Sequence, residues 1–389
     1  MKYYLSAGFA LKLLETPSVY HIREDELYEL DDSAFQFLKR CSDPDGCDDC
    51  TADSKFVEYC LSEGILTTGP VAVNRPLLLK APSPSLRYME FQITDRCNLK
   101  CKHCYIGVSG NNDLSIQDIR PILDEFEEMQ GLRLLITGGE PLLHGRFNEF
   151  NSLLPQYNFR KILFTNGLLL DKTLLKGLNV DEIQFSVDGM EHGHEALRGT
   201  GTYSIVRQKI ADALDSGIAV SAATMVHMEN LDEFENMDAL FRDLGIKDWT
   251  VDVPCAAGRL KDNPLFQTPP EVAGKYLNYG FVCGLHGGGE GFACGLHLLS
   301  VLADGNICKC AFYSDSPVGN IKKGLRKAWG KTGHIKLEEL ECSALSCKSI
   351  DTCRGGCRYR AETKGSSLGR DLYKCCSFDI LEKRKEVLE

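Results

Sequence analysis

The spacing of apolar residues in the first 70 positions predicts a small α+β unit. Three short apolar runs, bounded by polar clusters, have the length of β-strands. They cover residues 9–14, 19–22 and 26–30. Two amphipathic segments then predict helices at residues 33–41 and 55–63. Asp32 is the expected N-cap of the first helix, and Gly64 stands where a helix C-cap is usual.

From residue 87 the pattern alternates between apolar runs and amphipathic stretches. Prolines mark the preceding residues 71–86 as a linker. Six apolar runs of strand length follow, with helical stretches between them, at residues 88–94, 134–137, 162–165, 183–187, 220–226 and 249–253. Strands that alternate with helices pair in parallel through right-handed crossovers. Residues 87–265 are therefore expected to form an α/β domain, a partial (β/α)6 barrel.

Beyond residue 265 the periodicity fades and cysteines become frequent. Residues 280–378 hold ten of the 18 cysteines in the chain. A reducing cytosol does not sustain a disulfide scaffold, and disulfide-rich domains are much shorter than this chain. Metal or iron–sulfur ligation is the better account of these thiols, so residues 266–389 are expected to form a cysteine-rich domain in which metal replaces much of the hydrophobic core.

Charge and composition exclude several classes of protein. Acidic residues outnumber basic ones by 55 to 44 in a chain of 389 residues, which argues against a general nucleic-acid binder. No apolar run approaches the roughly 18–20 residues that span a bilayer, and the first 20 residues lack the apolar core of a signal peptide. We therefore expect a cytoplasmic protein with no nucleic-acid or membrane partner.

One group of cysteines follows the first predicted barrel strand. Cys97, Cys101 and Cys104 have the spacing CxxxCxxC. Three thiolates on one loop can bind three irons of a [4Fe–4S] cluster and leave the fourth iron open. The second strand is followed by Gly138, Gly139, Glu140 and Pro141. Together with the barrel pattern, these motifs resemble the radical S-adenosylmethionine (SAM) enzymes.

The resemblance implies a SAM-binding site along the strand ends. In that family the open iron binds SAM, which is cleaved to a 5′-deoxyadenosyl radical that abstracts hydrogen from the substrate. The GGEP segment would lie against the SAM amino group, Ser186 and Asp188 would lie near the ribose, and Arg198 near the carboxylate. Asn166 is a further match. The alternative for Asp188 and Arg198 is that they are ordinary surface charges.

The C-terminal cysteines resemble the SPASM extension of radical SAM enzymes, which holds two auxiliary [4Fe–4S] clusters. By that resemblance one cluster takes Cys294, Cys310 and Cys357, with Cys283 as the fourth ligand or with that position open. The other takes Cys342, Cys347, Cys353 and Cys375. Four residues separate Cys342 from Cys347 where the family has two, and Cys308 and Cys376 are left over. A zinc-bound subdomain is the alternative, since four thiolates suit zinc equally well.

The strand and helix pattern of residues 1–70 resembles the winged-helix-like RiPP recognition element, which binds the leader of a ribosomally made precursor peptide as an added strand. The alternative is a domain that only packs against the barrel. Cys41, Cys47, Cys50 and Cys60 are either a further metal site or, as we favour, two buried helix residues and a pair of loop thiols.

Taken together, the resemblances predict a radical SAM enzyme that modifies a ribosomal peptide, leaving a thioether, a carbon–carbon crosslink or an epimerised residue. A low-potential reductant such as flavodoxin or ferredoxin is implied. Cys255 follows the sixth strand, where a thiol could return a hydrogen atom to an epimerised residue; the alternative is a buried small residue. Rival predictions are an enzyme that acts on a tetrapyrrole or other cofactor precursor or on a sulfatase, and a multicluster electron carrier.

Overall fold

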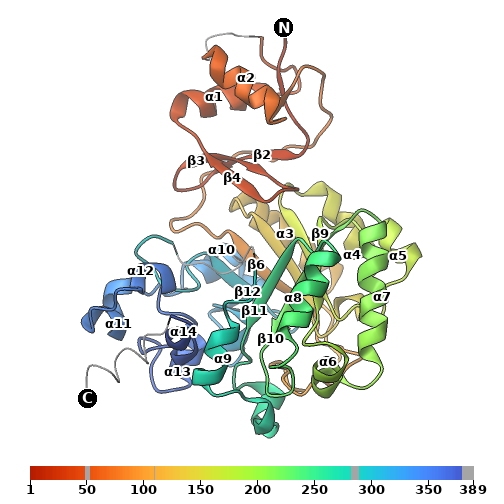
Figure 1. The fold of residues 1–389 in the computed structure, drawn as a ribbon. Coiled ribbons are helices and arrows are strands. Elements are labelled where there is room, and N and C mark those ends of the chain that lie inside the picture. Colours follow the sequence, from red (N-terminus) through yellow and green to blue (C-terminus); the bar gives the residue numbers. More distant parts are fainter. Residues whose placement is uncertain (49–52, 109, 282–288, 379–389) are drawn as a thin grey trace.

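The computed structural model describes residues 1–48, 53–108, 110–281 and 289–378, and its centre is a nine-stranded sheet (Figure 1). Six neighbouring strands run parallel in chain order. They are β6 (Tyr88–Thr94), β7 (Arg133–Gly138), β8 (Arg160–Thr165), β9 (Glu182–Ser186), β10 (Ala219–Met225) and β11 (Asp248–Asp252). The six predicted strands are confirmed to within two residues at each end. The barrel curvature stays a prediction.

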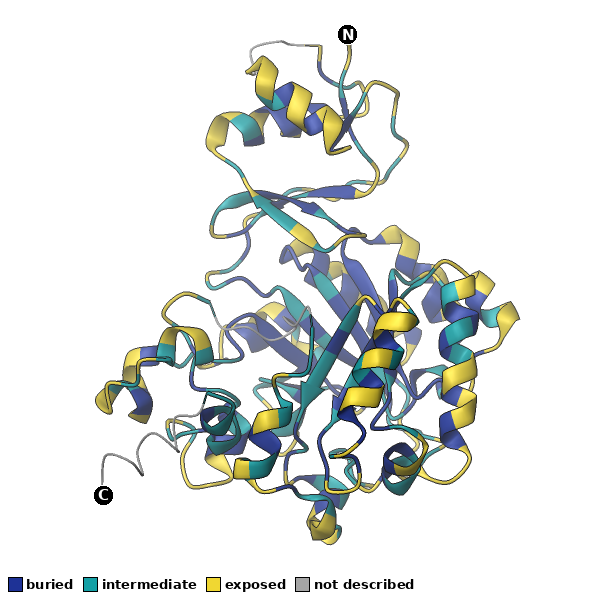
Figure 2. Ribbon diagram, viewed as in Figure 1, coloured by how far each residue is buried: buried dark blue, intermediate teal, exposed yellow. Residues whose placement is uncertain are grey.

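Helices connect consecutive strands and bury their apolar stripes. They are α3 (Ile116–Glu128), α4 (Phe147–Leu153), α5 (Lys172–Gly177), α6 (Glu191–Arg198), α7 (Thr202–Asp215) and α8 (Phe234–Asp243). In α3, the side chain of Ser115 caps the first turn, and Ile119, Leu123 and Phe126 lie on the buried face. Figure 2 shows the same division between buried and exposed sides along α7 and α8. Within the described residues, no helix is long and apolar enough to cross a bilayer.

Three short strands beyond residue 290 extend the same sheet. They are β12 (Leu298–Val301), β13 (Asn306–Cys308) and β14 (Gly319–Asn320). β12 pairs in parallel with β6, and β13 and β14 follow in antiparallel order. Sequence analysis did not predict them, because strands of two to four residues carry too little alternation to recognise. As a result, the cysteine-rich region is hydrogen-bonded to the strand that precedes the first cysteine loop.

Short helices with little periodicity make up the rest of the C-terminal region. They are α9 (Pro270–Tyr276), α10 (Leu325–Trp329), α11 (Glu341–Ala344), α12 (Ile350–Cys353), α13 (Arg358–Glu362) and α14 (Leu372–Ser377). α9 and α14 are in close contact, since a Cβ atom on Gly274 would lie 2.4 Å from the Cβ atom of Cys376. Among the described residues, the buried apolar core around α11 consists of Ala293, Leu337, Leu340 and Cys342, with Ile335, Cys347 and Ile350 partly buried against it.

The N-terminal unit stands apart from the sheet, at the top of Figure 1. Its elements are β1 (Tyr4–Leu5), β2 (Phe9–Leu13), β3 (Pro17–His21), β4 (Glu26–Glu29), α1 (Asp32–Cys41), α2 (Ser54–Ser62) and β5 (Leu66–Thr67). The three predicted strands are confirmed as an antiparallel sheet in the order β2-β3-β4. The predicted N-cap is wrong by one residue: the carboxylate of Asp31 accepts the backbone N–H of Ala34 at 2.8 Å, and Asp32 is already helical.

Ion pairs and linker contacts hold the N-terminal unit against the sheet. The buried Arg160 donates to the carbonyl of Ile22 at 3.0 Å and to the carboxylate of Glu182 at 2.6 Å. Arg133 forms an ion pair with Asp25 at 2.7 Å. In the linker, Arg75 donates to three backbone carbonyls of the N-terminal unit. The predicted linker is therefore packed against both neighbours.

Candidate functional site

The loop after β6 brings Cys97, Cys101 and Cys104 together. The three thiols are close enough to interact electrostatically with one another. Burial raises the pKa of Cys97 to about 11. The segment after β11 closes over this loop, since the backbone N–H of Arg259 donates to the carbonyl of Cys104 at 2.9 Å. A Cβ atom on Gly258 would lie 2.2 Å from that carbonyl, so only glycine fits there.

Polar contacts close the base of this loop, so that it leaves and re-enters the sheet at one place. The carboxylate of Asp95 accepts the backbone N–H of Asn112 at 2.8 Å and its side-chain amide at 2.6 Å. Arg96 forms an ion pair with Asp113, which also accepts the hydroxyl of Thr94 at 2.7 Å. Sequence analysis missed these residues, because polar groups next to a motif carry no pattern of their own.

Arg198 and Asp188 form a buried ion pair directed at the cysteine loop. The Arg198 guanidinium donates to the Asp188 carboxylate at 2.5 Å and to the Cys101 sulfur at 3.8 Å. The other carboxylate oxygen of Asp188 accepts the backbone N–H of Met225 at 2.7 Å. Burial raises the pKa of Asp188, but the Arg198 charge, together with His103 and the backbone N–H of Met225, outweighs burial and holds that pKa at about 2. Neither residue is an ordinary surface charge.

Gly138 and Gly139 pack against the end of β6. A Cβ atom on Gly138 would lie 2.4 Å from the carbonyl oxygen of Thr94, and one on Gly139 would lie 2.3 Å from that of Arg96. The glycines thus let the second strand end approach the root of the cysteine loop. In the structure, these two glycines closely approach the chain's own backbone, whereas the motif predicted a close approach to SAM.

Glu140 is fully buried and ties the ends of two strands together. Its carboxylate accepts the Thr165 hydroxyl at 2.8 Å, the backbone N–H of Asn166 at 2.9 Å and that of Leu142 at 3.3 Å. Burial raises the pKa of Glu140 to about 7. Pro141, also buried, begins a short 3-10 turn after it. Both carboxylate oxygens therefore already have protein donors, and a role for Glu140 toward SAM stays a prediction.

The remaining SAM-site candidates lie at neighbouring strand ends. The Asn166 amide after β8 donates to the side chain of Asn98 in the cysteine loop at 2.9 Å. Ser186 is the last residue of β9 and is half-buried. The structure thus gathers the candidates from β7, β8 and β9 around one loop, although no contact with SAM is tested.

Three histidines surround the Arg198–Asp188 pair, and sequence analysis singled out none of them. His194 Nδ1 accepts the backbone N–H of Asp188 at 3.3 Å, and His227 Nε2 lies 3.0 Å from its carbonyl oxygen. His103, within the cysteine motif, has a buried Nδ1 atom with no hydrogen-bond partner. Burial lowers the pKa of His103 to about 4, so this ring is neutral near pH 7.

The first C-terminal set of cysteines is also brought together. The thiols of Cys294 and Cys310 are both close enough to the Cys357 thiol to interact with it electrostatically. The thiol of Cys255, after β11, lies next to that of Cys357; their interaction lowers the pKa of Cys357 to about 7 and raises the pKa of Cys255. Cys283 lies outside the described residues.

The second set forms a separate group. Cys342 interacts electrostatically with Cys347, and Cys375 with both Cys342 and Cys353. The described residues include no group of three or more His, Cys, Asp or Glu side chains that could hold a single metal ion. A [4Fe–4S] cube binds one thiolate at each iron and requires a wider separation of sulfurs. The donor set of both groups is thiolate, which suits iron–sulfur clusters.

A row of aromatic rings connects the two cysteine regions. Tyr105, next to Cys104, lies 5.1 Å from Phe312 between ring centroids, and Phe312 stacks on Tyr359 at 5.4 Å. Phe312 and Tyr359 each stand two residues after a cysteine of the first C-terminal set. These rings therefore hold the loops of the two cysteine regions at a defined separation.

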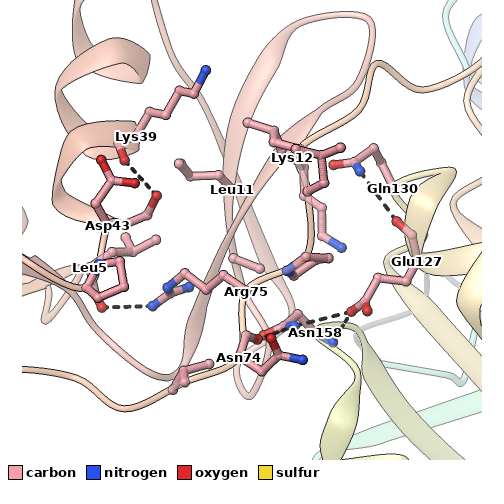
Figure 3. Close-up of a pocket in the computed structure, with 17 residues that line it drawn as sticks. Leu5, Leu11, Lys12, Lys39, Asp43, Asn74, Arg75, Glu127, Gln130 and Asn158 are labelled. Carbon is pink, nitrogen blue, oxygen red and sulfur yellow. Dashed lines mark hydrogen bonds between the residues drawn. The ribbon is translucent and has the colours of Figure 1, made fainter.

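A pocket of about 530 Å³ lies elsewhere, between the N-terminal unit and the sheet domain (Figure 3). The linker residues Asn74 and Arg75 cross it, and Lys12, Glu127 and Asn158 line its other side. None of the described residues that line it is a cysteine. The pocket is thus formed where the N-terminal unit packs against the sheet domain, and it is separate from the cysteine loops.

Comparison with known proteins decides what the cysteine loop and its sheet are. Residues 91–241 match the Radical SAM superfamily. The chain contains a radical SAM domain. This match runs from within β6 to within α8 and includes the CxxxCxxC loop and the Arg198–Asp188 pair.

Individual relatives extend the likeness beyond the radical SAM domain. The AdoMet-dependent heme synthase of Oleidesulfovibrio alaskensis is 26% identical over 196 residues, 48% of this chain and 50% of the relative. The mycofactocin maturase MftC of Mycobacterium tuberculosis is 26% identical over 315 residues, 69% of this chain and 77% of MftC. The chain spans about half the length of the first curated relatives it matches.

Among solved structures, Streptococcus suis SuiB bound to its precursor peptide SuiA has the same fold. The TM-score is 0.70 over 96% of this chain and 100% of SuiB, at 13% sequence identity. This likeness covers the N-terminal unit, the radical SAM domain and the cysteine-rich region. The prediction of an α/β radical SAM fold is confirmed.

Proposed function

We propose that this enzyme modifies a ribosomally made peptide. When bound, a [4Fe–4S] cluster and SAM would supply a 5′-deoxyadenosyl radical that abstracts hydrogen from the peptide. The product would be a thioether, a carbon–carbon crosslink or an epimerised residue. The observation that carries this proposal is the N-terminal unit, which presents an open sheet edge. It is anchored to the radical SAM domain by the Arg133–Asp25 ion pair and by a hydrogen bond from the buried Arg160 to the Ile22 carbonyl.

The residues around the cysteine loop suit these cofactors. Cys97, Cys101 and Cys104 would hold the cluster, and their thiolates would face the buried guanidinium of Arg198. The Asp188 carboxylate keeps that guanidinium in place, and the histidines beside it are neutral near pH 7. In the C-terminal region, the two cysteine sets would hold two auxiliary clusters, and a flavodoxin or ferredoxin would deliver the electron.

The edge strand β4 has the features of a peptide-binding strand. The backbone N–H of Leu30 donates to the carbonyl of Pro17, so by antiparallel alternation the polar backbone groups of Leu27 and Glu29 point away from β3. No described residue donates to or accepts from them. The opposite edge is occupied, since Phe9 and Leu13 of β2 bond to the linker. A leader peptide bound by residues 1–70 would therefore add to β4.

The product is tested by anaerobic co-expression of the enzyme with any short peptide encoded beside its gene, followed by mass spectrometry. A loss of two hydrogens supports crosslinking or another oxidation. An unchanged formula with one solvent deuterium supports epimerisation. An unmodified peptide, with SAM still cleaved, contradicts the proposal.

The binding mode is tested separately with two variants of one exposed residue. Glu29→Pro removes an outward N–H of β4 without breaking a bond to β3, whereas Glu29→Ala keeps it. We expect about a fivefold weaker affinity for the peptide with Glu29→Pro alone, because one strand hydrogen bond is worth roughly 1 kcal/mol. Equal affinities of the two variants would exclude strand addition at β4.

The second candidate is an enzyme that acts on a tetrapyrrole, which the likeness to AdoMet-dependent heme synthase favours. The two candidates differ in the role of residues 1–70. A tetrapyrrole enzyme needs no leader edge, so Glu29→Pro would leave its turnover of an iron–porphyrin precursor unchanged. Conversion of such a precursor in vitro would replace the peptide proposal.

A further inference from the structure

Cys255 belongs to the radical SAM domain in sequence but lies against the C-terminal region. It stands three residues after β11 and is 3% exposed. Arg360 in α13 draws the two parts together, because its guanidinium donates to the Asp252 carboxylate at 2.7 Å and to the Val253 carbonyl at 3.4 Å. The other end of the same guanidinium pairs with Asp371 at 2.9 Å. The end of β11 is thereby fixed beside α13.

The residue that precedes α13 is Cys357, and the same group of contacts fixes its position. Its backbone N–H donates to the Asp371 carboxylate at 2.8 Å, the same carboxylate that binds Arg360. The Cys255 thiol lies next to the Cys357 thiol. Cys294 and Cys310 also lie near the Cys357 thiol, so Cys357 has cysteine neighbours from three other segments: Cys255, Cys294 and Cys310.

We infer that Cys255 is the fourth protein ligand of the auxiliary cluster held by Cys294, Cys310 and Cys357. The inference rests on the proposed function, which places a cluster at those three residues. A [4Fe–4S] cube takes four thiolates, and Cys255 supplies the missing one in a buried site. Arg360 and Lys309 lie beside these thiols, and their positive charges offset the negative charge that four thiolates bring.

This assignment changes what Cys255 and the cluster can do. A thiolate bound to iron has no S–H hydrogen to return to a peptide radical, so Cys255 would not be the hydrogen donor. A cluster with four protein thiolates has no open iron for a substrate thiol and is suited to accept an electron. The cluster would also join the end of β11 to the C-terminal region through inorganic sulfide and iron.

The test compares Cys255→Ala with Cys308→Ala in the full-length, anaerobically reconstituted enzyme. Cys308 is equally buried in the same region but lies on β13 and is assigned to no cluster. Iron and acid-labile sulfide are counted per chain, and the oxidised protein is examined by electron paramagnetic resonance. We expect Cys255→Ala to lose about one iron per chain and to show a [3Fe–4S] signal, with Cys308→Ala unchanged.

Further variants separate failure of this inference from failure of the cluster proposal. Cys255→Ser offers an oxygen ligand in place of sulfur and should restore the iron that Cys255→Ala loses. Full iron content and no [3Fe–4S] signal in Cys255→Ala, combined with iron loss in Cys310→Ala, would overturn the fourth ligand alone. Full iron content in Cys310→Ala as well, or zinc in place of iron, would overturn the auxiliary cluster itself.

Discussion

The two cysteine regions of this protein are held in place by different forces. The CxxxCxxC loop leaves a strand of a large parallel sheet, and its base is closed by Asp95 and Asn112 and by Arg96 and Asp113. The second C-terminal set, around Cys342, lies among helices of four to six residues with a small apolar core. Burial of apolar surface therefore positions the first region, whereas the second has too little of it to fold on that basis.

This difference indicates which part of the fold depends on a bound iron–sulfur cluster. In the radical SAM domain, the cluster would occupy a loop that the sheet has already placed. In the C-terminal region, arginine side chains hold some of the loops in place. Arg358 donates to the carbonyls of Gly355, Ser367 and Gly369. Hydrogen bonds of this kind add roughly 1 kcal/mol each and do not replace a core.

Removal of the clusters should separate the two regions most clearly. Chelation of iron from the full-length protein is expected to abolish amide protection across α11 to α14, because thiolate–iron bonds replace the missing core there. Protection in β6 to β11 should remain. Hydrogen exchange with mass spectrometry measures both in one experiment, and equal loss in both regions would contradict the comparison.

Arg198→Leu should produce the next largest effect, confined to the sheet domain. It leaves the buried Asp188 carboxylate without its partner, which costs about 3–5 kcal/mol of unfolding free energy. Urea unfolding of the cluster-free protein measures it. Arg207→Leu, on the exposed face of α7, is the matched control and should change the unfolding free energy by less than about 0.5 kcal/mol.

Gly356→Ala should act on the C-terminal region alone. Gly356 has φ of +68°, and a Cβ atom there would lie 2.6 Å from the Asp371 carboxylate that binds Cys357. Strain and crowding together should cost about 2–4 kcal/mol and lower the iron content. Gly365→Ala has a positive φ as well but meets open space, so its iron content should stay normal. Equal iron loss in both variants would point to backbone strain alone.

The smallest effect should be a pH dependence of the sheet domain that Asp188 contributes. Its pKa is about 2 in the folded chain against an unperturbed 3.8, so its stabilisation is present above about pH 4 and is lost as the pH falls toward 2. The shift corresponds to about 2 kcal/mol. Urea unfolding of the cluster-free protein between pH 5 and pH 2.5 should show a shallower dependence in Asp188→Asn than in the wild type. Parallel curves would show that Asp188 carries no such stabilisation.

The parts of the protein that could be predicted from the sequence are those with a repeating pattern or a short motif. The six parallel strands were predicted because alternation of apolar strands and amphipathic helices extends over more than 150 residues. Strands β12 to β14 were missed because each is too short to show a period. Glu140 was assigned to SAM from its motif, whereas the structure engages both of its oxygens with Thr165 and with backbone N–H groups.

The sequence by itself determined the class of chemistry and the order of the regions, because cysteine spacing and hydrophobic periodicity are local properties. Only the tertiary structure decided which distant side chains meet. Arg198 lies 97 residues from Cys101, and Cys255 lies 102 residues from Cys357. No periodicity encodes such pairs. They come together because the parallel strands end at one edge of the sheet and because Arg360 ties the last of them to the C-terminal helices.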